Sequence, residues 1–190
     1  MRLFVGLELD EPVRMAAAAV AARLETRVTE AARDFKARWI PGRNLHITIW
    51  FFGEIADDAA AALTGQLRAP LGVTPFELAV RGCGAFPRSG PPRVLWIGTA
   101  DGTAAMIEAH AALARRLAPL GYLPESRSYS PHVTMARVKE PGRAARAVRQ
   151  VLAGDPADCG RTRVGALTLF RSRLSPQGAS YEPLLRVPLV

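Results

Sequence analysis

Apolar and polar residues alternate in seven short stretches of the chain, and a strand is expected in each. These stretches are residues 3–9, 44–53, 75–86, 93–99, 129–138, 164–170 and 181–189. Between them, apolar residues recur at helical spacing, and Pro and Gly residues mark the ends of the segments. Helices are therefore expected over residues 12–32, 57–67, 103–117 and 141–152.

The order of these elements indicates the fold class. Strands come in pairs with helices between them, and the sequence contains no glycine-rich phosphate loop of the G-x-G-x-x-G or G-x-x-x-x-G-K-[ST] type. This favours an α+β fold with antiparallel strands over a doubly wound parallel sheet. A length of 190 residues suits a single domain, residues 1–190, made of two small lobes.

A short motif occurs in both halves of the chain. Residues 44–49 read Asn-Leu-His-Ile-Thr-Ile, and residues 130–135 read Ser-Pro-His-Val-Thr-Met, 86 residues later. The repeated motif, together with the repeated order of elements, predicts a bilobal molecule with pseudo-two-fold symmetry. Successive side chains of a strand point to opposite faces. Each His is therefore expected to share a face with its Thr, while the apolar residues enter the core.

If the two strands lie side by side, they present two imidazoles and two hydroxyls. The residues concerned are His46, Thr48, His132 and Thr134. Hydrolysis of a phosphodiester needs a base that takes a proton from water and an acid that protonates the leaving oxygen, and imidazole can do either near neutral pH. Thr hydroxyls can donate to phosphate oxygens as charge develops there. A single His-x-Thr on a strand is usually a structural hydrogen-bonded pair, but its duplication favours the catalytic interpretation.

Other functional classes find less support. His110 lies at helical spacing, has no Thr two residues later and is interpreted as a surface or interface residue without a role. No His-x-x-x-His or Cys/His cluster occurs, so neither a metal nor a cofactor is expected. Cys83 and Cys159 form no C-x-x-C motif and are expected to be free thiols. No stretch approaches the ~18 apolar residues of a membrane span, and the first residues are too few for a signal peptide. A cytoplasmic location without membrane contact is therefore expected.

Positive charge bears on the kind of partner. The chain has 25 Lys and Arg against 17 Asp and Glu, a net charge of +8, and all the basic residues except Lys36 and Lys139 are Arg. Arg offers a planar fork of donors that suits phosphate, and a basic balance favours an anionic partner such as RNA or a nucleotide. A genome-wide preference for Arg codons explains the excess equally well, so charge alone does not decide.

The chain resembles a known family in these motifs and in several flanking segments. The flanking segments are Arg2-Leu3-Phe4-Val5, Phe52-Gly53-Glu54, Gly84-Ala85-Phe86-Pro87, Arg93-Val94-Leu95-Trp96, Pro131 to Arg137, Leu169 to Leu174 and Gly178-x-x-Tyr181. Together with the two H-x-T-x motifs, they are similar to the 2H phosphoesterases, and within them to the RNA 2′,3′-cyclic phosphodiesterases, also called the LigT or 2′-5′ RNA ligase family. The resemblance covers nearly the whole chain.

The resemblance implies a fold, an activity and a set of site residues. The implied fold is bilobal, with two antiparallel sheets backed by helices and a central groove. The implied activity is hydrolysis of an RNA terminal 2′,3′-cyclic phosphate to a 2′-phosphomonoester, with His46 as proton donor and His132 as proton acceptor. Thr48 and Thr134 would hold the phosphate.

Further residues near the motifs are weaker candidates. Arg137 matches a family position that can contact substrate, but strand alternation places it on the face opposite His132 unless a bulge intervenes. Arg127 and Tyr129 flank the second motif and are candidates for the rim of the groove. Trp50 departs from the family, which often has Lys or another polar residue there. It is expected either to weaken a phosphate contact or to widen a stacking surface at the groove mouth.

Three alternatives stay open. The first is 2′-5′ RNA ligation of tRNA halves, the reverse of the same step. The second is a cyclic phosphodiesterase of small nucleotides, and the third is a non-catalytic RNA-binding module, which would not need two imidazoles paired with hydroxyls. The expected partner is therefore RNA with a 2′,3′-cyclic phosphate end or a nucleotide, and the chain is expected to be a monomer.

Overall fold

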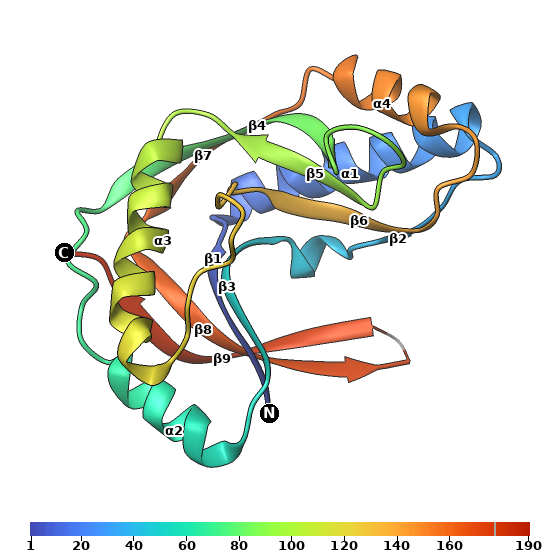
Figure 1. Cartoon of the computed structure of the whole chain (residues 1–190). Helices are drawn as coiled ribbons and strands as arrows, with labels where there is room; N and C mark the ends of the chain where they lie inside the picture. The colour runs from blue at the N-terminus through green and yellow to red at the C-terminus, as the bar shows by residue number, and fades with distance from the viewer. Residues whose placement is uncertain (177) are drawn as a thin grey trace.

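Hydrogen bonds join strands from both halves of the chain into one curved antiparallel sheet (Figure 1). The computed structural model describes every residue from 1 to 190 except residue 177. The strands are β1 (Arg2–Glu8), β2 (Lys36–Trp39), β3 (His46–Glu54), β4 (Phe76–Phe86), β5 (Val94–Thr99), β6 (Val133–Glu140), β7 (Asp158–Val164), β8 (Ala166–Ser175) and β9 (Gly178–Pro188). The helices are α1 (Glu11–Ala31), α2 (Asp57–Gln66), α3 (Thr103–Leu117) and α4 (Ala145–Ala153), with 3₁₀ turns η1 (Gly42–Asn44) and η2 (Ala118–Leu120).

The strand order shows two halves with a narrow connection. It runs β7-β4-β5-β6-β3-β1-β8-β9, and β2 pairs with the same strand β6. The two halves meet where β3 pairs with β6, through the single residue pair Ile47 and Val133. Helices α1 and α4 pack against β7 and β4 of one half, while α3 contacts β4 and α2 (Figure 1). The predicted α+β fold is confirmed, and its two expected sheets are joined at this residue pair.

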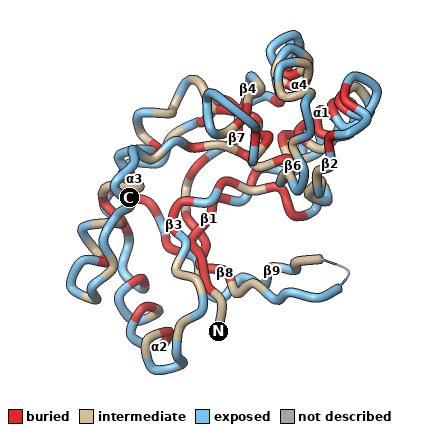
Figure 2. Tube along the Cα trace, turned by 45° about the vertical axis from the view of Figure 1, so that its right-hand side comes forward, coloured by how far each residue is buried: buried red, intermediate tan, exposed pale blue. Residues whose placement is uncertain are grey.

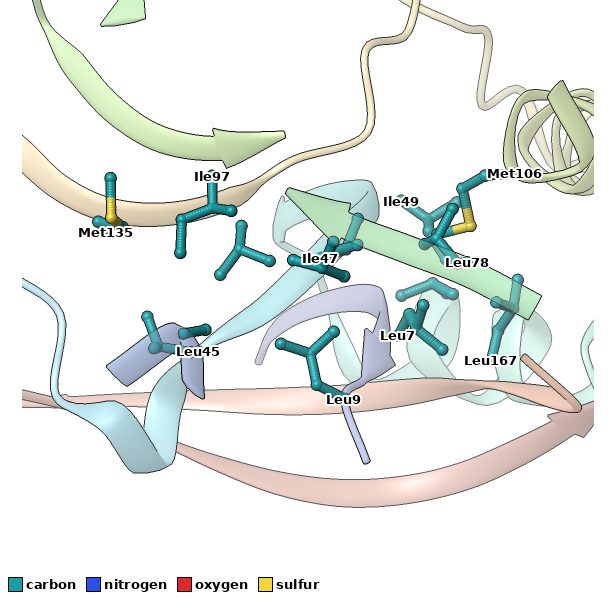
Figure 3. Close-up of a cluster of buried hydrophobic side chains, with 14 of the residues drawn as sticks. Leu7, Leu9, Leu45, Ile47, Ile49, Leu78, Ile97, Met106, Met135 and Leu167 are labelled. Atoms are coloured by element: carbon teal, nitrogen blue, oxygen red, sulfur yellow. The ribbon is translucent and has the colours of Figure 1, made fainter. Parts of the chain in front are cut away.

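The core forms where the apolar faces of the two motif strands meet. Ile47, Val133 and Met135 are completely buried, and Ile49 is 4% exposed. Figure 3 shows Ile47 and Ile49 beside apolar side chains of the neighbouring strands and of α3, and Figure 2 shows the buried segments along β1 and β3. The expectation that the apolar residues of both motifs enter the core is confirmed.

Some elements differ from those expected. β2 is only four residues long and β7 carries the polar sequence Asp-Cys-Gly-Arg-Thr-Arg-Val, so neither was expected as a separate strand. The strand expected from residue 129 begins at Val133, because Pro131 has no N–H to donate to a ladder. The helix expected from residue 141 begins at Ala145, after Pro141 and Gly142. No described helix is long and apolar enough to span a membrane.

Candidate active site

The two motif histidines lie on either side of the connection between the two halves. His46 is the first residue of β3, and His132 immediately precedes β6. The residues that follow them, Ile47 and Val133, are pairing partners. The positive charge of His132 contributes to lowering the pKa of His46, which also places the two rings near one another. The structure therefore brings the two motifs together.

Each histidine is held in the same way by its own chain. Nδ1 of His46 lies 2.7 Å from the carbonyl oxygen of Asn44, and Nδ1 of His132 lies 2.7 Å from the carbonyl oxygen of Ser130. A carbonyl oxygen only accepts hydrogen bonds, so Nδ1 carries a proton in both rings. In the neutral ring, Nε2 then has a free lone pair, and in the protonated ring it is a donor. Nε2 of His46 lies 3.1 Å from Oγ1 of Thr48.

Aromatic side chains fix the orientation of both imidazoles. The His46 ring centroid lies 4.9 Å from that of Phe4 and 5.0 Å from that of Tyr181, which meets it edge-on at 80°. Phe86 packs edge-on against His132, with centroids 5.0 Å apart. Such contacts hold a ring in one rotamer, so Nε2 of each histidine has a defined position.

Both motif strands carry a β-bulge three residues after the histidine. In the ladder of β1 with β3, Val5 pairs with Trp50 and Gly6 pairs with Thr48, which leaves Ile49 without a partner. In the ladder of β5 with β6, Leu95 pairs with Ala136 and Trp96 pairs with Thr134, which leaves Met135 without a partner. An extra residue reverses the alternation of the side chains that follow. The bulges are therefore a second feature, besides the motifs, that repeats in the two halves.

The bulge in β6 decides the position of Arg137. Strand alternation alone puts its side chain on the face opposite His132, and the bulge at Met135 returns it to the same face. The charge of Arg137 contributes to lowering the pKa of both His46 and His132. Arg137 therefore lies at the site, and its position depends on a bulge.

The bulge in β3 has the opposite consequence for Trp50. Its side chain is 8% exposed and stacks on His110, with ring centroids 5.4 Å apart. The expectation that Trp50 widens a stacking surface at the groove mouth is wrong, because the bulge at Ile49 turns its side chain into the core. The next residue, Phe51, is exposed instead, and the guanidinium of Arg2 lies 4.8 Å from the centre of its ring.

The environment of both motif histidines disfavours the imidazolium form. Burial is the largest cause and lowers the pKa of His46 and of His132, and the charge of Arg137 lowers both further. The hydrogen bonds to the carbonyls of Asn44 and Ser130 act in the opposite direction without outweighing burial. In the free protein near neutral pH both rings are thus mainly neutral, and a bound anion would favour protonation.

The other predicted residues have distinct surroundings. Thr48 is exposed and Thr134 half-buried, on the two motif strands. Tyr129 donates a hydrogen bond from its hydroxyl to the carbonyl oxygen of Thr48 (3.1 Å), and its ring stacks on His110 with centroids 4.3 Å apart. Arg127 pairs with Glu125 through Nε and Oε2 (2.5 Å), and its charge also contributes to lowering the pKa of His132.

Three aromatic residues at this site had no role expected from the sequence. Phe4, Phe86 and Tyr181 contact the histidines, and their only signal was membership of the family-like segments. A cavity of about 200 Å³ lies beside His46 and is also lined by Phe4 and Tyr181. These contacts could not be predicted because they join strands far apart in the sequence.

Titratable groups elsewhere do not form a second candidate site. Among the described residues there is no cluster of three or more His, Cys, Asp or Glu side chains able to hold a metal ion. Cys83 and Cys159 are free thiols, as expected, and burial raises their pKa to about 12 and about 11. Neither is therefore a thiolate near neutral pH.

Comparisons with known proteins agree with this geometry. A family model described as the 2′-5′ RNA ligase superfamily matches residues 14–175. A relative from Aeropyrum pernix named RNA 2′,3′-cyclic phosphodiesterase is 31% identical over 166 residues, which cover 87% of this chain and 93% of the relative. A relative of the same name from Thermus thermophilus is 33% identical over 200 residues, covering 100% of this chain and 90% of the relative.

Solved structures show the same fold. The crystal structure of TT0787 of Thermus thermophilus has a TM-score of 0.72 at 28% identity, covering 100% of this chain and 98% of that one. The structure of E. coli LigT complexed with 3′-AMP has a TM-score of 0.72 at 26% identity, covering 99% and 97%.

Proposed function

Because the chain belongs to the 2′-5′ RNA ligase superfamily, we propose that it is an RNA 2′,3′-cyclic phosphodiesterase. It hydrolyses the terminal cyclic phosphate of RNA to a 2′-phosphomonoester. One observation carries the proposal. Two imidazoles lie on either side of one strand pair. In each of them a carbonyl occupies Nδ1, so that Nε2, which in His46 also contacts Oγ1 of Thr48, is the nitrogen left for proton transfer.

Two proton transfers accompany the reaction. Nε2 of neutral His132 takes a proton from water, and the water oxygen attacks phosphorus. The bond between phosphorus and O3′ breaks, and O3′ takes a proton from Nε2 of protonated His46. The phosphate stays on O2′, and each histidine ends in the protonation state in which the other began. The assignment of donor and acceptor follows the family resemblance.

The remaining residues stabilise charge on the phosphate. The hydroxyls of Thr48 and Thr134 donate to its non-bridging oxygens, and Arg137 supplies a positive charge on the same face. Burial keeps both histidines mainly neutral before substrate binds. The anionic phosphate then favours protonation of one ring, which supplies the acid that the reaction needs.

The test is turnover of a substrate panel in EDTA. The panel contains RNA with a 2′,3′-cyclic end, mononucleoside 2′,3′-cyclic phosphates and 3′,5′-cyclic nucleotides, with the product isomer identified. We expect hydrolysis of the first two to 2′-phosphates. His46→Gln and His132→Gln should each lower kcat by about 10²–10⁴-fold, while the matched control His110→Phe should retain activity.

Three results would contradict the proposal. Activity that EDTA abolishes would show dependence on a metal. Full activity in either motif variant would remove the two-histidine mechanism. Joined RNA as the main product from fragments with cyclic-phosphate and 5′-hydroxyl ends would identify the protein as a ligase.

A further inference from the structure

Two arginines face each other on neighbouring strands beside the proposed active site. Arg38 of β2 is the direct pairing partner of Arg137 of β6. Like charges directly opposite one another destabilise a sheet, and neither Arg38 nor Arg137 has an acidic partner among the described residues. The same ladder pairs Lys36 with Glu140, whose charged atoms lie 2.9 Å apart. No acidic side chain among the described residues therefore neutralises the charges of Arg38 and Arg137, and a bound anion would do so.

Arg38 extends from its strand to the other half of the sheet. A Cβ placed on Gly178 of β9 would lie 3.2 Å from Nη2 of Arg38, so the guanidinium rests against the start of that strand. Close by, Nδ2 of Asn44 donates to the carbonyl oxygen of Ala179 (2.6 Å). The guanidinium of Arg38 therefore lies beside β9, and Arg38 shares a face of the sheet with its pairing partner Arg137.

Tyr181 of β9 contacts the first motif and is close enough to both arginines for their charges to affect it. Its ring meets His46 edge-on, with centroids 5.0 Å apart. Among the described residues its hydroxyl has no hydrogen-bond partner, and the charges of Arg137, Arg2 and Arg38 all favour its phenolate form, although burial outweighs them and raises its pKa. The hydroxyl therefore remains a neutral donor within reach of the same positive charges.

We infer that Arg38 and Tyr181 form a second anion subsite beside Arg137 and the cyclic phosphate, and that this subsite holds the phosphodiester on the 5′ side of the terminal nucleotide. The inference rests on the proposed function. The guanidinium of Arg38 lies at Gly178, three residues before Tyr181 on β9. Three residues of strand span about 10 Å, so Arg38 is placed for a second phosphate and not for the cyclic one. Guanidinium groups match phosphate oxygens as bidentate donors. A mononucleotide has no such second phosphate, so the subsite selects RNA ends.

The test compares two substrates that differ by one nucleotide. They are cytidine 2′,3′-cyclic phosphate and the dinucleotide CpC with a 2′,3′-cyclic end and a 5′-hydroxyl. A third substrate carries an uncharged methylphosphonate in place of the internal phosphodiester. We expect kcat/KM of the wild-type protein to be roughly tenfold or more higher for the dinucleotide, and we expect the methylphosphonate to lose most of that advantage.

Variants of the subsite residues test whether the subsite causes the higher kcat/KM for the dinucleotide. Arg38→Gln should remove most of the dinucleotide preference, with a far smaller effect on the mononucleotide, and Tyr181→Phe should act in the same direction while keeping the ring beside His46. Arg33→Gln is the matched control, since Arg33 is also exposed and without an ion pair among the described residues. It should leave the preference intact.

Each contrary result has a distinct meaning. Equal loss for both substrates in Arg38→Gln would overturn the second subsite, because Arg38 would then serve the cyclic phosphate itself. A wild-type protein without dinucleotide preference, or a methylphosphonate that retains it, would overturn the subsite as well. Turnover of neither cyclic phosphate would instead overturn the proposed function, and the inference with it.

Discussion

At the scale of single residues, Arg137 acts on both proposed catalytic groups through its charge. A nearby positive charge disfavours the imidazolium form and lowers its pKa, and Arg137 does this to His46 and His132 alike. Removing the charge should therefore raise the pKa of both rings. In Arg137→Gln we expect the alkaline limb of the pH profile of kcat/KM to move to higher pH, because the acid keeps its proton longer, while the maximal value falls.

The control for this prediction is another exposed arginine. Arg33→Gln changes the net charge equally and should leave the limb in place. If the limb of Arg137→Gln stays or moves to lower pH, the electrostatic account of Arg137 is wrong. A purely structural role of Arg137 would lower activity without moving the limb.

The absence of a side chain at Gly6 leaves room for the ring of His46. A Cβ at Gly6 would lie 3.1 Å from Cε2 of Phe4, 3.2 Å from the carbonyl oxygen of Ile47 and 3.4 Å from Cδ2 of His46. The backbone oxygen cannot move away easily, so the rings must shift. Displacement of a reacting group by about 1 Å can cost 10²-fold in rate. We expect Gly6→Ala to lower kcat roughly ten- to a hundredfold.

The matched control for Gly6→Ala is Gly165→Ala, whose added Cβ meets nothing within 4 Å. Turnover of cytidine 2′,3′-cyclic phosphate and urea unfolding are measured for both variants. Normal kcat in Gly6→Ala would show that His46 tolerates the crowding.

At the scale of elements, a stack of three aromatic rings ties α3 to the first motif. His110 of α3 stacks on Trp50 of β3 and on Tyr129, whose hydroxyl binds the carbonyl of Thr48. Each aromatic pair contributes about 0.5–1.5 kcal/mol beyond burial. We expect His110→Ala to lower the free energy of unfolding by about 1–3 kcal/mol, measured by urea denaturation.

The replacement His110→Phe separates stacking from charge. Phe keeps the ring and removes the titratable group, so it should retain most of the stability and the activity. If Phe is as destabilising as Ala, the ring is not what holds these elements together. His110 thus has a place in the structure that its sequence position did not suggest.

The motif strands were predictable and their bulges were not. Alternation along residues 46–49 and 132–135 correctly placed four apolar side chains in the core. The position of Trp50 depends on the bulge at Ile49, and that of Arg137 depends on the bulge at Met135. A bulge is set by the register with a neighbouring strand, which a single stretch of sequence does not contain.

Pairing between distant strands limited the rest of the prediction. β2 has too few residues for an alternating pattern, and its position became visible only through its pairing with β6. Arg38 could not be distinguished from the other arginines for this reason. Tyr181 reaches His46 only because β8, which pairs with β1, brings β9 into the same sheet.

At the scale of the whole molecule, the arginines behind the net charge of +8 fall into two groups, those with a partner in the protein and those without one. Many arginines away from the site bind acids or carbonyls, as Arg23 and Arg27 do with the buried carboxylate of Asp155. Arg38 and Arg137 have no such partner among the described residues. The excess of Arg alone could not separate codon preference from phosphate binding, but these two positions support phosphate binding locally.

The whole molecule also depends on the single residue pair that joins the two halves of the sheet. Ile47 is completely buried and pairs with Val133, between the strands that carry the two histidines. Ile47→Val should cost only about 0.5–1.5 kcal/mol of stability, yet it loosens the contact that sets the distance between the two imidazoles. Leu63→Ala in α2, which is equally buried but remote from the motifs, should cost about 2–5 kcal/mol. We expect kcat for cytidine 2′,3′-cyclic phosphate, measured where both variants are folded, to fall more in Ile47→Val than in Leu63→Ala. The reverse order would mean that activity follows overall stability and that this residue pair has no special part in aligning the motifs.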